Sequence, residues 1–249
     1  MGDRTRIDWC DSSWNPVTGC SHGCAYCYAR RIARRFSGGF ECGLGRTHEL
    51  IEPLKLKKDG KVMPYPFGFD PTFHRYKLEE PQKWRKPRTI FVCSMADLFG
   101  DWVPDEWIEC VINACKAAPK HRYLFLTKNS RRYIDLAQKG ILPQKDNFWY
   151  GCSVTRQDEP FFFSDRHNSF ASIEPILEPF EWNPEIMRSD LPDWIIVGAE
   201  TGNRKDKAVP ERDWISGIVN ECEKHQIPLF MKESLRNIMD NDFKQEYPW

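Results

Sequence analysis

Three cysteines near the N-terminus have the spacing of ligands to an iron–sulfur centre. Cys20, Cys24 and Cys27 follow one another as C-x3-C-x-Tyr-C within one short segment. Three thiolates can hold three irons of a [4Fe–4S] cube and leave the fourth iron without a protein ligand. An open iron can bind a substrate or cofactor and transfer an electron to it. The spacing therefore predicts a catalytic cluster rather than an electron relay.

A structural zinc site is the main alternative for these cysteines. Zinc sites usually complete a tetrahedron with a second pair of ligands, and the sequence has no such pair, although Cys10 and Cys42 are isolated candidates for a fourth ligand. A disulfide framework fits less well, because the other cysteines are scattered and no secretion signal precedes them.

The cysteine motif resembles that of the radical S-adenosylmethionine (radical SAM) superfamily, C-x3-C-x-aromatic-C, with Tyr26 as the aromatic residue. This resemblance implies that the open iron chelates the amino and carboxylate groups of SAM. Reductive cleavage would then give a 5′-deoxyadenosyl radical, which abstracts hydrogen from a substrate. The protein would supply binding and orientation, and an external flavodoxin- or ferredoxin-like donor would supply the electron.

The composition excludes several other classes. Among 249 residues, 36 basic residues balance 36 acidic ones, so global charge favours neither a nucleic-acid nor a membrane partner. No apolar run is long enough to cross a bilayer. Ten cysteines without a secretion signal suggest a reducing compartment, so we expect a cytoplasmic enzyme.

Short apolar runs alternate with helical patterns along most of the chain. This alternation predicts parallel strands joined by helices, that is, an α/β fold. We expect one domain over 1–249, a partial (β/α)6-type radical SAM barrel, with an irregular insertion at 37–88 after the first helix; a doubly wound open sheet is the alternative. The expected strands are 7–10, 89–93, 123–126, 148–152, 170–176, 194–197 and 228–231, and the expected helices are 28–36, 104–115, 131–138 and 211–224.

Polar residues follow nearly every expected strand, where α/β folds gather their chemistry. For SAM, Asp97 or Glu200 could accept the amino group, and Lys128 could pair with the carboxylate. The remaining candidates for SAM binding are Ser94 beyond the second strand, Ser153, Thr155 and Glu174 for the ribose, and Tyr26 and Gly198 for the adenine.

Three further residues could take part in the reaction itself. Cys93 and Cys152 end expected strands and could donate a hydrogen atom to a substrate radical, although buried cysteines are commonly small apolar residues. His74 could transfer a proton near neutral pH.

Several longer blocks of the chain carry a second resemblance: Trp14–Cys20, Cys27–Ala29, Phe69–His74, Ser94–Phe99, Leu126–Lys128, Gly151–Val154, Ile173–Leu177 and Ile196–Gly202. These blocks resemble the phage Gp37/Gp68 family, a domain of unknown function. The phage connection implies a nucleobase, a nucleotide or a base in DNA as the substrate, and modification of a peptide or a small metabolite is the alternative. A non-enzymatic, zinc-containing nucleic-acid-binding protein is the alternative from another class.

Basic and aromatic residues are interleaved in the expected insertion. Such a mixture suits a single strand or a flipped-out base, and a solvated loop anchored by a few rings is the alternative. The aromatic members are Tyr65, Phe67, Phe69, Phe73, Tyr76 and Trp84; the basic ones include His48, Lys55, Lys57, Lys58, Lys61, Arg75, Lys77, Lys83, Arg85, Lys86 and Arg88.

Overall fold

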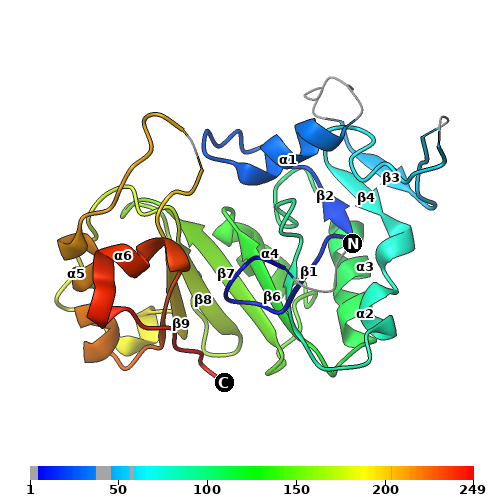
Figure 1. The fold of residues 1–249 in the computed structure, drawn as a ribbon. Coiled ribbons are helices and arrows are strands. Elements are labelled where there is room, and N and C mark those ends of the chain that lie inside the picture. Colours follow the sequence, from blue (N-terminus) through cyan, green and yellow to red (C-terminus); the bar gives the residue numbers. More distant parts are fainter. Residues whose placement is uncertain (1–4, 38–45, 57–58, 203) are drawn as a thin grey trace. The chain divides into compact units, whose positions relative to one another are not determined.

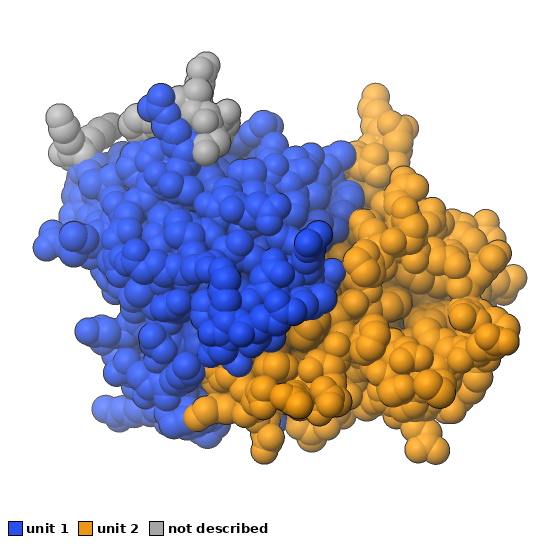
Figure 2. Space-filling view, turned by 180° about the vertical axis from the view of Figure 1, so that it is seen from behind, with its two compact units in different colours: residues 1–5, 10–142 blue, residues 6–9, 143–249 orange. Residues whose placement is uncertain are grey.

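The computed structural model describes residues 5–37, 46–56, 59–202 and 204–249 (Figure 1). The chain divides into two compact units, one of residues 1–5 and 10–142 and one of residues 6–9 and 143–249 (Figure 2). Each unit combines parallel strands with helices, so the expected α/β class is confirmed. The expectation of one domain over 1–249 stays a prediction, and the units are described separately.

The first unit contains three parallel strands in the order β1-β5-β6. They are β1 (Ser12–Trp14), β5 (Thr89–Val92) and β6 (Arg122–Thr127). All four residues of β5 are buried, as expected for a parallel strand that is covered on both faces.

Two helices follow the strands of this unit, α3 (Asp105–Lys116) after β5 and α4 (Ser130–Gln138) after β6. Pro104 precedes α3, and Trp107, Ile108 and Val111 are buried at helical spacing. The predicted helix and its apolar face are therefore confirmed.

A second, small sheet in the first unit has the order β2-β4-β3. It consists of β2 (Val17–Thr18), β3 (His48–Leu50) and β4 (Thr72–His74), and short helices η1 (Arg75–Lys77) and α2 (Glu80–Lys83) follow it. The expectation that 37–88 lacks regular structure is thus only partly right for its described residues. Strands of two or three residues are too short to show an alternating pattern.

The second unit contains four parallel strands in the order β7-β8-β9-β10. They are β7 (Phe148–Val154), β8 (Asn168–Ile173), β9 (Trp194–Val197) and β10 (Leu229–Met231). Helix α5 (Arg212–Lys224) joins β9 to β10 and packs in a core with Ile195, Val197 and Leu229. Short helices complete the unit: η2 (Arg188–Asp190), η3 (Glu233–Leu235), α6 (Arg236–Met239) and η4 (Asp240–Asp242).

The expected strand at 7–10 is wrong. Trp9 lies in a turn, 2% exposed, with its ring 6.2 Å from that of Phe170 and 6.5 Å from that of Trp194. Burial of one large ring therefore produced the apolar pattern. The expected strand 170–176 is shifted, because β8 ends at Ile173 before a cis Glu174–Pro175 bond.

None of the helices in the described ranges has the length and apolar character needed to cross a bilayer.

Candidate functional site

The segment that carries the three cysteines is fixed by backbone contacts within the first unit. Gly19 N donates to Met95 O at 2.9 Å, and Cys20 N donates to Phe69 O at 3.1 Å. Gly19 has φ +88, and a Cβ at this position would lie 2.2 Å from the carbonyl oxygen of Asp70. Only glycine fits this close approach of two backbones without strain, so Gly19 sets where the cysteine loop leaves β2.

The three cysteines lie on one partly exposed loop that ends in a helix. None of the cysteines within the described ranges is in a disulfide, and Cys20, Cys24 and Cys27 are each partly accessible. Helix α1 (Tyr28–Phe36), as predicted, begins directly after Cys27, whose Sγ accepts a hydrogen bond from Arg30 N at 3.4 Å. A thiolate at a helix N-terminus is favoured by the helix dipole.

The thiols also affect one another. Burial is the main cause that raises the pKa of Cys20 to about 12; nearby Asp97, Cys27 and Cys24 contribute in the same direction, and the His22 amide acts in the opposite one. Thiolates this close together need a compensating cation, as in an iron–sulfur cluster. The donor set therefore fits a [4Fe–4S] cluster.

Within the part of the chain that the structure describes, no three His, Cys, Asp or Glu side chains are arranged as ligands of a single metal ion. The cysteines of a cube instead bind separate irons.

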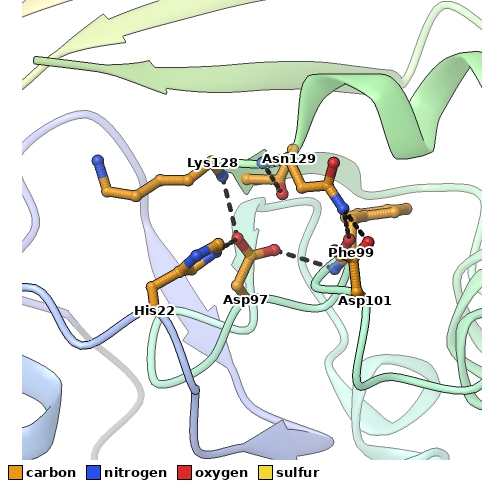
Figure 3. A network of polar contacts seen from close by, with 7 residues as sticks. His22, Asp97, Phe99, Asp101, Lys128 and Asn129 are labelled. Carbon is orange, nitrogen blue, oxygen red and sulfur yellow. Dashed lines mark hydrogen bonds and ion pairs between the residues drawn. The ribbon is translucent and has the colours of Figure 1, made fainter. Parts of the chain in front are cut away.

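A buried carboxylate holds the cysteine loop to the ends of β5 and β6 (Figure 3). Asp97 Oδ2 is 2.7 Å from His22 Nε2, within the loop, and accepts a hydrogen bond from Lys128 N at 3.0 Å. Asp97 Oδ1 accepts one from Phe99 N at 3.0 Å. The ring of His22 also packs edge-on against Trp102 at 4.8 Å. Asp97 thus positions three segments, and its predicted contact with the SAM amino group stays a prediction.

Lys128 and Tyr26 lie together beside this network. Lys128 Nζ is 5.6 Å from the centroid of the Tyr26 ring, and its side chain extends away from Asp97 in Figure 3. The structure therefore brings together two residues that the sequence predicted for SAM binding, one from the cysteine loop and one from the end of β6.

Asn15 organises the turn after β5, a role that sequence reasoning missed. Its Oδ1 accepts hydrogen bonds from Met95 N at 2.8 Å and Ser94 Oγ at 3.2 Å. The carbonyl oxygen of Ser94 in turn accepts a hydrogen bond from Tyr28 OH at 2.6 Å. Asn15 directly precedes a proline in the Trp14–Cys20 block, and this turn signal was the only available hint.

A second group of predicted residues gathers within the second unit. Glu174, just after β8, forms an ion pair with Lys232, just after β10. Gly198 lies at the end of β9, and a Cβ there would be 2.9 Å from Lys232 Cδ and 3.4 Å from Glu174 Cδ. Ala199 N donates a hydrogen bond to Ser234 Oγ at 3.0 Å. Gly198 thus makes room for the ion pair, and Lys232 is a member of this group that sequence reasoning missed.

The other predicted residues of this unit are engaged in local contacts. Thr155 Oγ1 donates to Glu159 at 3.1 Å. Glu200 accepts two hydrogen bonds from Arg204, at 2.8 and 2.7 Å, and this guanidinium lowers the pKa of the Glu200 carboxyl. Ser153 is partly buried in β7. Their predicted contacts with SAM stay predictions.

A comparison with protein families decides where this chain belongs. Residues 4–242 match the family described as "Protein of unknown function (DUF5131)". The chain belongs to the DUF5131 family. No curated protein and no solved structure gave a match. The resemblances of this DUF5131 chain to the Gp37/Gp68 and radical SAM proteins stay predictions.

The three predicted catalytic residues of the DUF5131 chain are all buried. His74 is fully buried in β4, where Nε2 is 2.8 Å from Thr18 Oγ1, and burial lowers the pKa of His74 to about 3. Burial likewise raises the pKa of the Cys93 thiol to about 12. Cys93 and Cys152 are each 2% exposed. In this structure a substrate could not reach these three side chains, so their predicted roles in the reaction stay predictions.

The rings of the expected insertion divide into core and surface groups. Tyr65, Phe69 and Phe73 are buried, so they pack rather than stack on a ligand. Phe67 is partly exposed and stacks on His48, with the rings 3.9 Å apart and 7° from parallel. Lys57 and Lys58 lie outside the described residues.

Proposed function

We propose that this protein is a radical SAM enzyme with a [4Fe–4S] cluster on Cys20, Cys24 and Cys27. The single observation that carries the proposal is the anchored loop that presents these three thiols together beside Lys128 and Tyr26. When bound, the cluster and SAM supply an electron-driven cleavage of a sulfonium C–S bond and a radical that abstracts hydrogen from the substrate. The parallel strands are compatible with the partial (β/α)6-type barrel of that superfamily.

The chain's own residues would bind SAM and orient it beside the cysteine loop. The Lys128 ammonium is a suitable partner for a carboxylate near the cysteine loop, and the face of Tyr26 offers an apolar contact. His22 and Asp97 hold the loop in place, while Gly19 fixes its first turn.

A nucleobase, nucleotide or base in DNA is the proposed substrate. Support comes from the stacked pair His48 and Phe67, which are both partly exposed and whose rings lie 3.9 Å apart. Stacking on an aromatic side chain is also the contact by which proteins hold unpaired bases.

Anaerobic reconstitution with iron and sulfide tests the proposal. The purified protein should turn brown, bind about four irons and, with SAM and dithionite, release 5′-deoxyadenosine that mass spectrometry detects. Each of Cys20→Ala, Cys24→Ala and Cys27→Ala should abolish the product. A colourless, air-stable protein that contains zinc would refute the proposal.

Two further cysteine variants serve as controls. Cys110→Ala removes a partly exposed thiol of α3 that lies outside the loop and should change neither iron content nor product. Cys10→Ala tests for a fourth ligand. If it abolished the product while the other thiols remained, the fourth iron would not be open as proposed.

A further inference from the structure

Helix α1 presents an apolar stripe to solvent instead of burying it. Tyr28, Ile32 and Phe36 are 44%, 38% and 52% exposed and follow one another at i, i+4 and i+8. Residues at this spacing share one face of a helix. The helix is held to the protein by the small residues Ala29 and Ala33, which are buried on a different face, and by the Tyr28 hydroxyl, which donates to the Ser94 carbonyl at 2.6 Å.

Arginines border the stripe. Arg31, Arg34 and Arg35 are exposed, and no carboxylate of the described residues forms an ion pair with any of them. Arg31 and Arg35 lie four residues apart, along the edge of the stripe, and Arg35 Cζ is 5.5 Å from the centroid of the Phe36 ring. Aromatic and arginine side chains around an apolar centre are typical of protein interfaces.

The helix begins where the proposed cluster is held. Cys27 is its N-cap, and nine residues at 1.5 Å per residue make the helix about 14 Å long. A partner on this stripe would therefore lie close to the cluster. The cluster needs an electron from outside the chain.

We propose that the stripe Tyr28–Ile32–Phe36 and its arginines are the docking surface for an acidic one-electron donor protein. This inference rests on the proposed function and adds the place and the chemistry of the donor's contact. These guanidinium groups, which no carboxylate in the described ranges pairs with, select a partner with surface carboxylates. Ile32 at the centre of the stripe favours a protein over a nucleic acid, because an aliphatic side chain offers bases no stacking surface.

Binding of a purified acidic flavodoxin to the reconstituted protein tests the inference. Arg31→Glu/Arg35→Glu and Ile32→Ser/Phe36→Ser should each weaken binding at least tenfold, and binding by the wild-type protein should weaken as salt rises. The matched control is Arg131→Glu/Ile134→Ser on α4, which changes an exposed arginine and a 50% exposed isoleucine in the same unit. It should bind as the wild-type protein does.

Two assays of 5′-deoxyadenosine separate this inference from the proposed function. The α1 variants should lose at least tenfold in flavodoxin-driven product at subsaturating flavodoxin but keep dithionite-driven product within twofold. If dithionite gives no product with the wild-type protein, the proposed function fails, whereas the binding measurements still decide the docking surface. No flavodoxin binding by the wild-type protein, or equal binding by all variants, would overturn the inference. So would α1 variants that lose single-stranded DNA binding while flavodoxin binding is unchanged.

Discussion

Replacing Asp97 with alanine should separate two functions of one carboxylate, stabilising the first unit and holding the cysteine loop. Asp97 is 5% exposed, and its carboxylate accepts three hydrogen bonds. The donors are His22 Nε2 at 2.7 Å and the backbone amides of Phe99 and Lys128 at 3.0 Å each. The substitution leaves all three without this acceptor (Figure 3).

The cost can be estimated contact by contact. A hydrogen bond to a charged group contributes about 1.5–3 kcal/mol. The His22 side chain is 24% exposed and can bond to water instead, so the two backbone amides dominate the loss. We therefore expect the free energy of unfolding to fall by about 3–5 kcal/mol. Native proteins typically have a free energy of unfolding of about 5–15 kcal/mol. The expected loss is a large part of this range but does not exceed it, so the variant should still fold.

Urea unfolding and iron content after reconstitution measure the two functions. His22→Ala removes the loop's contacts with Asp97 and Trp102 but leaves both backbone amides bonded to Asp97. It should therefore lower stability by about 1 kcal/mol yet lower iron retention as much as Asp97→Ala does. Asp101→Ala is the matched control, because the exposed Asp101 accepts a hydrogen bond from Asn129 Nδ2 at 2.7 Å but does not contact the loop. An Asp97→Ala protein as stable as the wild type, or one that retains as much iron as Asp101→Ala, would refute this reasoning.

Three further predictions concern glycine and histidine positions. Gly19→Ala should lower the free energy of unfolding by more than 2 kcal/mol and abolish iron binding, because its Cβ would lie 2.2 Å from a backbone oxygen. Gly23→Ala is the control: its φ is +76 but its surroundings are open, so chemical unfolding should show a loss of only about 1–2 kcal/mol. Gly198→Ala should lower the unfolding midpoint by displacing Lys232 from Glu174, whereas Gly217→Ala, in α5 with nothing within 4 Å, should raise it through helix propensity. An unfolded histidine binds a proton below pH 6.5, but His74 does not until about pH 3, so the folded state should lose stability as the pH falls from 6.5 toward 3. The loss should approach about 1.4 kcal/mol per pH unit, and His74→Gln should flatten the slope between pH 6 and 5; an unchanged slope would contradict the burial argument.

Most of the α/β elements could be predicted from local pattern. The strands at β5, β6, β7, β9 and β10 read as apolar runs because both faces of each are covered. The β2-β4-β3 sheet could not be predicted, since its strands have only two or three residues. The wrongly predicted strand at 7–10 also reflects the limits of short patterns, because one buried ring in a turn, here Trp9, gives the same local signal as a short strand.

The candidate site shows a similar division. The spacing of Cys20, Cys24 and Cys27 was sufficient to predict a cluster, and the position of Lys128 after a strand was sufficient to place it at the edge where chemistry gathers. The sequence did not predict that Asp97 holds the cysteine loop. Its contacts with His22 and with two backbone amides depend on residues up to 75 positions away, and sequence spacing carries no information about such partners.

The order of cysteines, aromatic residue and helix along the chain was therefore determined by the sequence itself, because ligands of one loop need only short-range spacing. Tertiary structure alone decided three other features: which carboxylate holds the loop, which glycine makes room for a neighbouring backbone, and which predicted catalytic side chains are buried. The physical reason is that burial and hydrogen-bond partnership arise from contacts between segments distant in the chain, and these contacts decide whether a polar side chain can react, bind or only support.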